Sequence, residues 1–116
     1  MKKFLAIYLG TPEAFEQWKK LSDSERQQRE EQGMKAWMAW GDKHAKVILD
    51  QGSPLGKTKA VGPQGTSDVR NAMAGYVLVQ AESHEAAAKL FEGHPHFAIF
   101  PGQSVEIMEC LPPPPQ

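Results

Sequence analysis

The segment His94-Pro95-His96 places two imidazoles on either side of a rigid proline. Imidazole titrates near neutral pH, so each histidine can act as a general acid or base. A structural role is the alternative, because Gly93 ends the preceding helical pattern and His94 can cap helix carbonyls or pack against Phe97. His94 and His96 are therefore the candidate catalytic residues.

Trp37, Trp40 and His44 recur at the spacing of one helix face. Such a face can line a pocket for an aromatic ligand, with His44 as its polar end. Large aromatic side chains more often belong to a core, and we assign Trp37 to the core. For Trp40 and His44, a pocket wall and an exposed helix surface both remain open.

Tyr8 and Tyr76 lie in the two most apolar short segments of the chain. A buried phenol needs a hydrogen-bond partner, so both hydroxyls can point into one cavity; the alternative is a pair of core tyrosines that bond to the backbone. Glu106 is a candidate partner for His94, and its alternative is a surface charge on an edge strand. With Trp40 and His44, these residues are the candidate ligand contacts.

The sequence has four histidines, at positions 44, 84, 94 and 96. Catalytic zinc usually needs three protein ligands that converge. His84 and His94 flank a predicted helix and lie about 15 Å apart by helix rise, so they cannot share an ion. The glycines at 62 and 65 do not form a phosphate-binding GxxxxGK[ST] motif. We expect neither a metal nor a cofactor.

Composition excludes several classes of protein. The chain has 116 residues, 13 Lys and Arg, 14 Asp and Glu, and a net charge of -1, which argues against a nucleic-acid partner. Its apolar runs are shorter than the ~18 residues of a membrane span, so no membrane partner is expected. The single cysteine, Cys110, cannot form an internal disulfide and is predicted to be buried and inert. These features predict a cytoplasmic protein.

Four segments have the pattern of β-strands. Residues 3–9 and 75–81 are apolar on both faces, which indicates strands covered on both sides. Residues 55–61 contain two lysines and alternate weakly, as edge strands do. Residues 104–111 alternate cleanly, and residues 62–71 have the composition of a loop.

Capping residues mark the helices. Thr11-Pro12 begins a helix, and the capping box at Ser22–Glu25 restarts it. We expect a break at Gly33, and then a helix that ends at residues 52–54 and carries one apolar stripe. The stripe consists of Met34, Trp37, Met38, Ala45, Ile48 and Leu49. Ser83 caps a further helix over residues 84–92, and a connector over residues 93–102 follows.

This order of elements is the βαββαβ pattern of a ferredoxin-like α+β fold with a four-stranded antiparallel sheet. Its first and third strands lie in the middle of the sheet, where the two wholly apolar segments belong. The helices cover one face, and the other exposes Tyr8 or Leu9, Val79 or Leu78, and Met108 or Ile107. Such a patch is rarely left in water, so we expect a homodimer that pairs through the open sheet face. The alternative is a monomer covered by the 62–71 loop and the tail.

The sequence resembles the YCII-related domain family, most strongly over residues 52–110. The matching motifs are Gly62-Pro63, Gly75 to Ser83, Glu85-Ala86-Ala87, His94-Pro95-His96 and Val105-Glu106-Ile107. The resemblance implies ferredoxin-like subunits that pair as a dimeric α+β barrel. It makes residues 1–111 one domain. Residues 112–115 are all prolines, which predicts a proline-rich tail over residues 112–116.

Most members of this family have no assigned activity, and a related branch includes a dechlorinating enzyme of chloroaromatic breakdown. That branch carries a histidine near the first helix and an Asp-Pro motif, proposed to act as a dyad. Here the Asp-Pro position is His94-Pro95, and the helix position falls near Trp40 or Gly41, with His44 the nearest histidine. The dyad is not present intact.

We therefore expect a protein that binds a small organic molecule in a cavity between helices and sheet. The first alternative is a small cofactor-free lyase, isomerase or dechlorinase that uses His94 as its acid or base. The second, by analogy with other dimeric barrels, is a cofactor-free monooxygenase.

Overall fold

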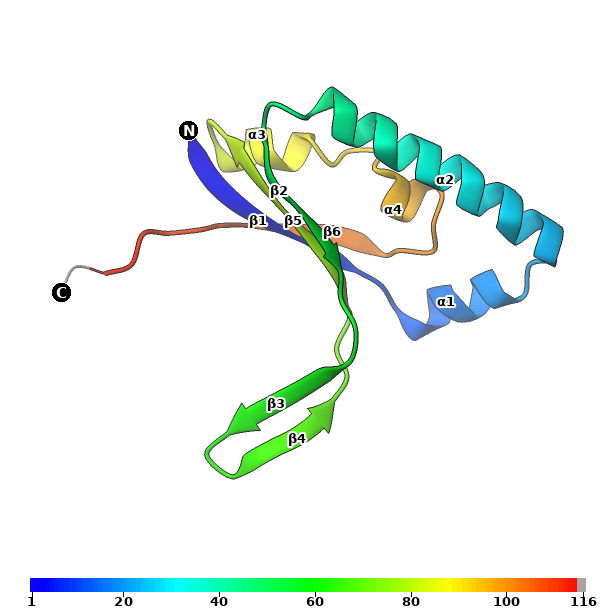
Figure 1. Cartoon of the computed structure of the whole chain (residues 1–116), viewed down its shortest axis with the longest axis horizontal. Coiled ribbons are helices and arrows are strands. Elements are labelled where there is room, and N and C mark those ends of the chain that lie inside the picture. Colours follow the sequence, from blue (N-terminus) through cyan, green and yellow to red (C-terminus); the bar gives the residue numbers. More distant parts are fainter. Residues whose placement is uncertain (115–116) are drawn as a thin grey trace.

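Two sheets and four helices make up the computed structural model, which describes residues 1–114 (Figure 1). The strands of the main sheet are β1 (Lys2–Leu9), β2 (Ile48–Pro54), β5 (Met73–Ala81) and β6 (Ser104–Glu109). A separate hairpin contains β3 (Thr58–Gly62) and β4 (Gly65–Val69). The helices are α1 (Pro12–Lys19), α2 (Asp23–Lys43), α3 (His84–Lys89) and α4 (Pro95–Ala98).

The main sheet is antiparallel, with the strand order β2-β5-β1-β6. β1 and β5 lie in the middle, as their apolar sequences predict, and the ferredoxin-like α+β fold class is confirmed. Figure 1 shows the helices on one side of this sheet.

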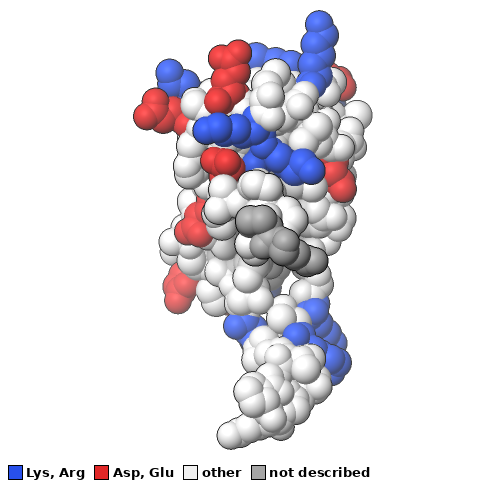
Figure 2. All heavy atoms as spheres, turned by 90° about the vertical axis from the view of Figure 1, so that its left-hand side faces the viewer, with Lys and Arg blue, Asp and Glu red and all other residues white. Residues whose placement is uncertain are grey.

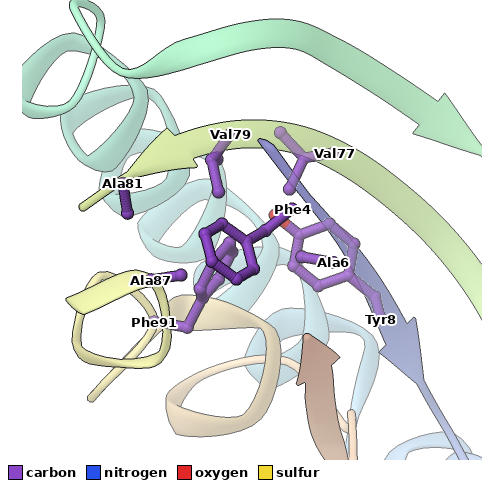
Figure 3. Packing of buried hydrophobic residues seen from close by; sticks show 8 residues of the cluster. All are labelled: Phe4, Ala6, Tyr8, Val77, Val79, Ala81, Ala87 and Phe91. Atoms are coloured by element: carbon purple, nitrogen blue, oxygen red, sulfur yellow. The ribbon is translucent and has the colours of Figure 1, made fainter. Parts of the chain in front are cut away.

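The core lies between the sheet and these helices. β1 contributes Phe4, Ala6 and Tyr8 to the core, and β5 contributes Val77 and Val79. Figure 3 shows how these side chains pack with Ala81, Ala87 and Phe91. Because side chains alternate along a strand, the residues between these core positions point to the other face of the sheet, the open face that the helices do not cover.

α2 is one continuous helix, so the predicted break at Gly33 is wrong. Gly33 is the buried residue of this helix, and a Cβ there would collide with the ring of Phe100. The glycine allows the ring to approach the helix closely, and it does not end the helix. Met34 and Met38 of the predicted stripe are 56% and 67% exposed.

The predicted extension of this helix to residue 49 is also wrong. α2 ends at Lys43, and Ile48–Pro54 forms the edge strand β2, which pairs with β5. This strand is irregular: its register shifts between Ile48 and Asp50 and again before Ser53. Gly52 permits the second shift, because its φ is 67° and a Cβ would strike the carbonyl of Tyr76.

The predicted edge strand at residues 55–61 is not part of the main sheet, and residues 62–71 are not simply a loop. Among residues 1–114, β3 and β4 pair only with each other, from Thr58 with Val69 to Gly62 with Gly65. The hairpin projects from the end of β2 and β5 (Figure 1). Pro63-Gln64 forms its turn, and Gly65 has a φ of 107°.

The segment after α3 contains a feature that the sequence did not predict. Within the expected connector, residues 95–98 form the short helix α4.

After β6, Cys110 is exposed, so the prediction of a buried thiol is wrong. Residues 112–114 of the predicted tail are in neither a helix nor a strand, and residues 115–116 lie outside the described residues. Across residues 1–114, we find no helix whose length and apolar character suit a membrane crossing.

Candidate functional site

Two adjoining cavities lie between α2 and the sheet. The first has a volume of about 270 Å³ and is lined by residues from α2 and from the strands: Tyr8, Trp37, Met38, Trp40, Gly41, Asp42, Ile48, Gln51 and Val77. The second, of about 440 Å³, shares Tyr8, Trp37 and Gln51 with the first and extends to His96 and Phe100. Tyr8 and Trp37 therefore stand where the two cavities meet.

His94 packs against Tyr8, with the ring centroids 5.2 Å apart, and is almost wholly buried, with 1% of its surface exposed. Its Nε2 is 3.4 Å from the Tyr8 hydroxyl oxygen, and the rings of Trp37 and Trp40 stand edge-on to it at 4.6 and 4.7 Å. Burial is the main cause that lowers its pKa to about 4, and His96 and His44 lower it further by charge repulsion. His94 is therefore neutral at pH 7. It does not line either of the two cavities.

The helix cap at α4 fixes the orientation of His94. The residue occupies the N-cap of α4, and its Nδ1 accepts the backbone N–H of His96 at 3.0 Å. The structural alternative, in which the His94 side chain caps carbonyls of the preceding helix, differs from the structure, where this side chain accepts from the next helix. Both ring nitrogens are engaged, so His94 holds Tyr8 in place.

His96 also packs against Tyr8, with the ring centroids 5.1 Å apart. Its Nε2 donates to the Leu9 carbonyl at 2.7 Å, and it lines the second cavity. Burial lowers its pKa, and the bond to Leu9 opposes that effect. A Cβ on Gly102 would collide with the His96 ring, so the glycine at this position leaves the space that the ring occupies.

Trp40 is a wall of the first cavity, and its indole N–H donates to the Leu90 carbonyl at 2.7 Å. His44 packs against Trp40 with ring centroids 5.2 Å apart, but it does not line the cavity. Burial, and after it the charge of Lys43, lowers the pKa of His44. Trp37 packs on the core as predicted and also lines both cavities.

The structure places Tyr76 and Glu106 on the face of the sheet opposite to Tyr8. Tyr76 pairs with Ile7, one position away from Tyr8 on β1, so the two tyrosine side chains belong to opposite faces of the sheet. Tyr76 still borders the second cavity at the edge of β5. Glu106 is exposed and pairs with Ile7 on β6, which places it on the open face and away from His94.

Other lining residues were missed by the sequence analysis. Gln51 lines both cavities, whereas the sequence pattern predicts the end of a helix at this position. Phe100 and Met34 contribute from the connector and from α2. The weak signal for Gln51 was the β-branched and apolar run Val47-Ile48-Leu49 before it. Over residues 1–114, no three His, Cys, Asp or Glu side chains come close enough together to hold a metal ion.

Comparison with protein-family models and with curated protein sequences gives no match. Among solved structures, the fold is similar to 5-chloro-2-hydroxyhydroquinone dehydrochlorinase from Burkholderia phenoliruptrix AC1100, in complex with 2,5-dihydroxybenzoquinone. The likeness has a TM-score of 0.54 at 14% identity and covers 91% of this chain and 90% of the other. It supports the α+β architecture over nearly the whole length of both chains.

Proposed function

We propose that this chain is a YCII-like protein that binds a small, planar organic molecule between α2 and the sheet. The observation that carries this proposal is the pair of cavities that share Tyr8 and Trp37. Their volumes approach or reach the ~300 Å³ at which small-molecule sites begin. Indole and phenol rings form the walls, and such faces stack on planar ligands. The likeness to an enzyme bound to a dihydroxybenzoquinone agrees with a ligand of this size.

Trp37→Ala tests this function, with acetophenone as the probe and NMR chemical-shift titration as the measurement. We expect the variant to weaken binding at least tenfold, because it removes the wall that both cavities share. Trp18→Ala is the matched control: Trp18 lies on α1 and lines neither cavity. Equal binding by all three proteins would contradict the proposed site.

A cofactor-free lyase, isomerase or dechlorinase is the second candidate, and the position of His96 favours it. His96 Nε2 is committed to Leu9, so in the neutral ring the Nδ1 carries the lone pair. His96 therefore suits the role of a base better than His94, whose nitrogens are both engaged. His94 then serves as a positioning residue that holds Tyr8.

Chloride release from 5-chloro-2-hydroxyhydroquinone, the compound named for the structural neighbour, tests this second candidate. If the protein is such an enzyme, the wild type should release chloride, and the His96→Gln variant should release it at least a hundredfold more slowly. The exposed His84 offers the control His84→Gln, which should leave the rate unchanged. If the wild-type protein releases no chloride above the buffer rate, this dechlorinase activity is excluded and the binding function stands.

We further propose that two copies pair through the open face of the sheet. Leu78, Leu5 and Met108 form a row across β5, β1 and β6 on that face. Figure 2 views this side, where uncharged side chains cover much of the main body and charged ones lie toward its upper end and along its left edge. The described helices lie on the opposite side, so a second sheet is the simplest cover.

A further inference from the structure

We propose that the cavity selects neutral molecules that carry a hydrogen-bond acceptor, such as a carbonyl oxygen, and that the Tyr8 hydroxyl donates to that atom. This inference rests on the proposed binding function and names the class of ligand. It follows from the direction in which hydrogen bonds run through His96, His94 and Tyr8.

The first link is the backbone N–H of His96, which can only donate. It points to Nδ1 of His94 at 3.0 Å, so that nitrogen carries a lone pair. Neutral imidazole then has its proton on Nε2, the nitrogen that faces Tyr8 at 3.4 Å. The Tyr8 oxygen is therefore the acceptor in this hydrogen bond.

The second link is the hydroxyl proton of Tyr8, which this arrangement leaves free. His94 is the hydrogen-bond partner of the Tyr8 hydroxyl among residues 1–114. Burial raises the pKa of Tyr8 above its ordinary value of 10.0, so the hydroxyl keeps its proton. Because Tyr8 lines both cavities, a bound molecule can accept a hydrogen bond from this hydroxyl.

The charge of the lining decides between a neutral acceptor and an anion. Asp42 is the charged residue among those that line the first cavity, and none of those that line the second is a Lys, Arg, Asp or Glu. Asp42 and Gln51 are exposed, which places them toward the solvent end. A carboxylate ligand would meet the Asp42 carboxylate without a cation to offset it. A ketone or quinone oxygen meets no such repulsion.

The first test needs no ligand and reads the His94 tautomer by ¹⁵N NMR at pH 7. We expect a protonated Nε2 and an unprotonated Nδ1. The tautomer with its proton on Nδ1 would reverse the hydrogen bond to Tyr8 and overturn the inference, while the binding function would stand.

The second test compares acetophenone with ethylbenzene, which differs in having a methylene in place of the carbonyl. We expect the acetophenone-to-ethylbenzene affinity ratio to fall at least fivefold in Tyr8→Phe and to stay unchanged in Trp18→Phe, a change on α1 outside both cavities. An equal ratio in wild-type protein and Tyr8→Phe overturns the inference alone. If neither compound binds the wild-type protein, the binding function fails as well.

Discussion

At the scale of single residues, the site is a set of neutral polar groups buried among aromatic rings. His94 and His96 are the buried polar residues of the structure, at 1% and 7% exposure. Each has a hydrogen-bond partner that accounts for its burial. The Nδ1 of His94 can accept the His96 N–H only while it is unprotonated, which makes the fold sensitive to acid through His94.

Lowering the pH should therefore destabilise the protein through His94. Its pKa falls from 6.5 to about 4 on folding, so the unfolded chain binds the extra proton between these values. The stability that His94 contributes is complete above pH 6.5 and is lost as the pH falls toward 4. We expect the free energy of unfolding to drop by about 2 kcal/mol between pH 7.5 and pH 5 through this residue.

Urea unfolding at the two pH values measures this loss. His94→Asn keeps a side chain that can cap α4 but does not titrate, and it should show at most half of the wild-type pH dependence. His84→Asn, at an exposed histidine, should behave like the wild type. An unchanged pH dependence in His94→Asn would show that His94 is not the group that senses acid.

At the scale of elements, two glycines within α2 have opposite roles. A Cβ on Gly33 would collide with Phe100, whereas a Cβ on Gly41 would meet no atom within 4 Å. Neither has a positive φ that would demand glycine. Their different surroundings allow the same substitution to be compared within one helix.

Gly41→Ala should raise the free energy of unfolding by about 0.5–1 kcal/mol, because alanine loses less backbone entropy than glycine in a helix. Gly33→Ala should lower it by about 1–3 kcal/mol, because overpacking against Phe100 outweighs that gain. Thermal unfolding followed by circular dichroism distinguishes the two. Stabilisation by both variants would mean that Phe100 does not need Gly33 to pack.

The β3–β4 hairpin stands apart from the rest of the structure. Within the described part of the chain its strands pair only with each other, and Val61 near its tip is 80% exposed. None of its residues belongs to the buried core. An isolated two-stranded hairpin contributes little stability of its own.

Replacement of residues 58–69 by Gly-Gly should therefore leave the main sheet intact. Thr58 and Val69 are paired, so their Cα atoms lie about 5 Å apart and a short linker can join the flanking segments. We expect the free energy of unfolding to change by less than about 1 kcal/mol, as measured by urea denaturation. A change of several kcal/mol would reveal contacts between the hairpin and the folded assembly.

At the scale of the whole molecule, the proposed pairing of two copies rests on the open face of the sheet. Met108 lies on the edge strand β6 and is 43% exposed. Met108→Lys places a charge in the apolar row without touching the core on the other face. An edge strand tolerates a lysine, so the effect should fall on association.

Light scattering after size exclusion should give twice the 12.9 kDa of one chain for the wild type, and a single-chain mass for Met108→Lys. Val61→Lys, the same charge on the exposed hairpin, should keep the wild-type mass. A single-chain mass for the wild type would contradict the proposed pairing.

The sequence by itself determined the features that depend on neighbours along the chain. Alternation placed β1 and β5 in the centre of the sheet, and Thr11, Ser22 and Ser83 each accept the expected N–H at a helix start. These patterns are local, because a strand repeats every two residues and a cap acts within three.

Only the tertiary structure decided the edge strand and the site. Residues 48–49 fit a helix stripe by spacing, yet they form a strand because the free edge of β5 offers hydrogen bonds. Tyr8 and His94 are separated by 86 residues in the sequence, so no local pattern predicts their contact. Strand register also separated Tyr8 from Tyr76, since a shift of one residue moves a side chain to the other face.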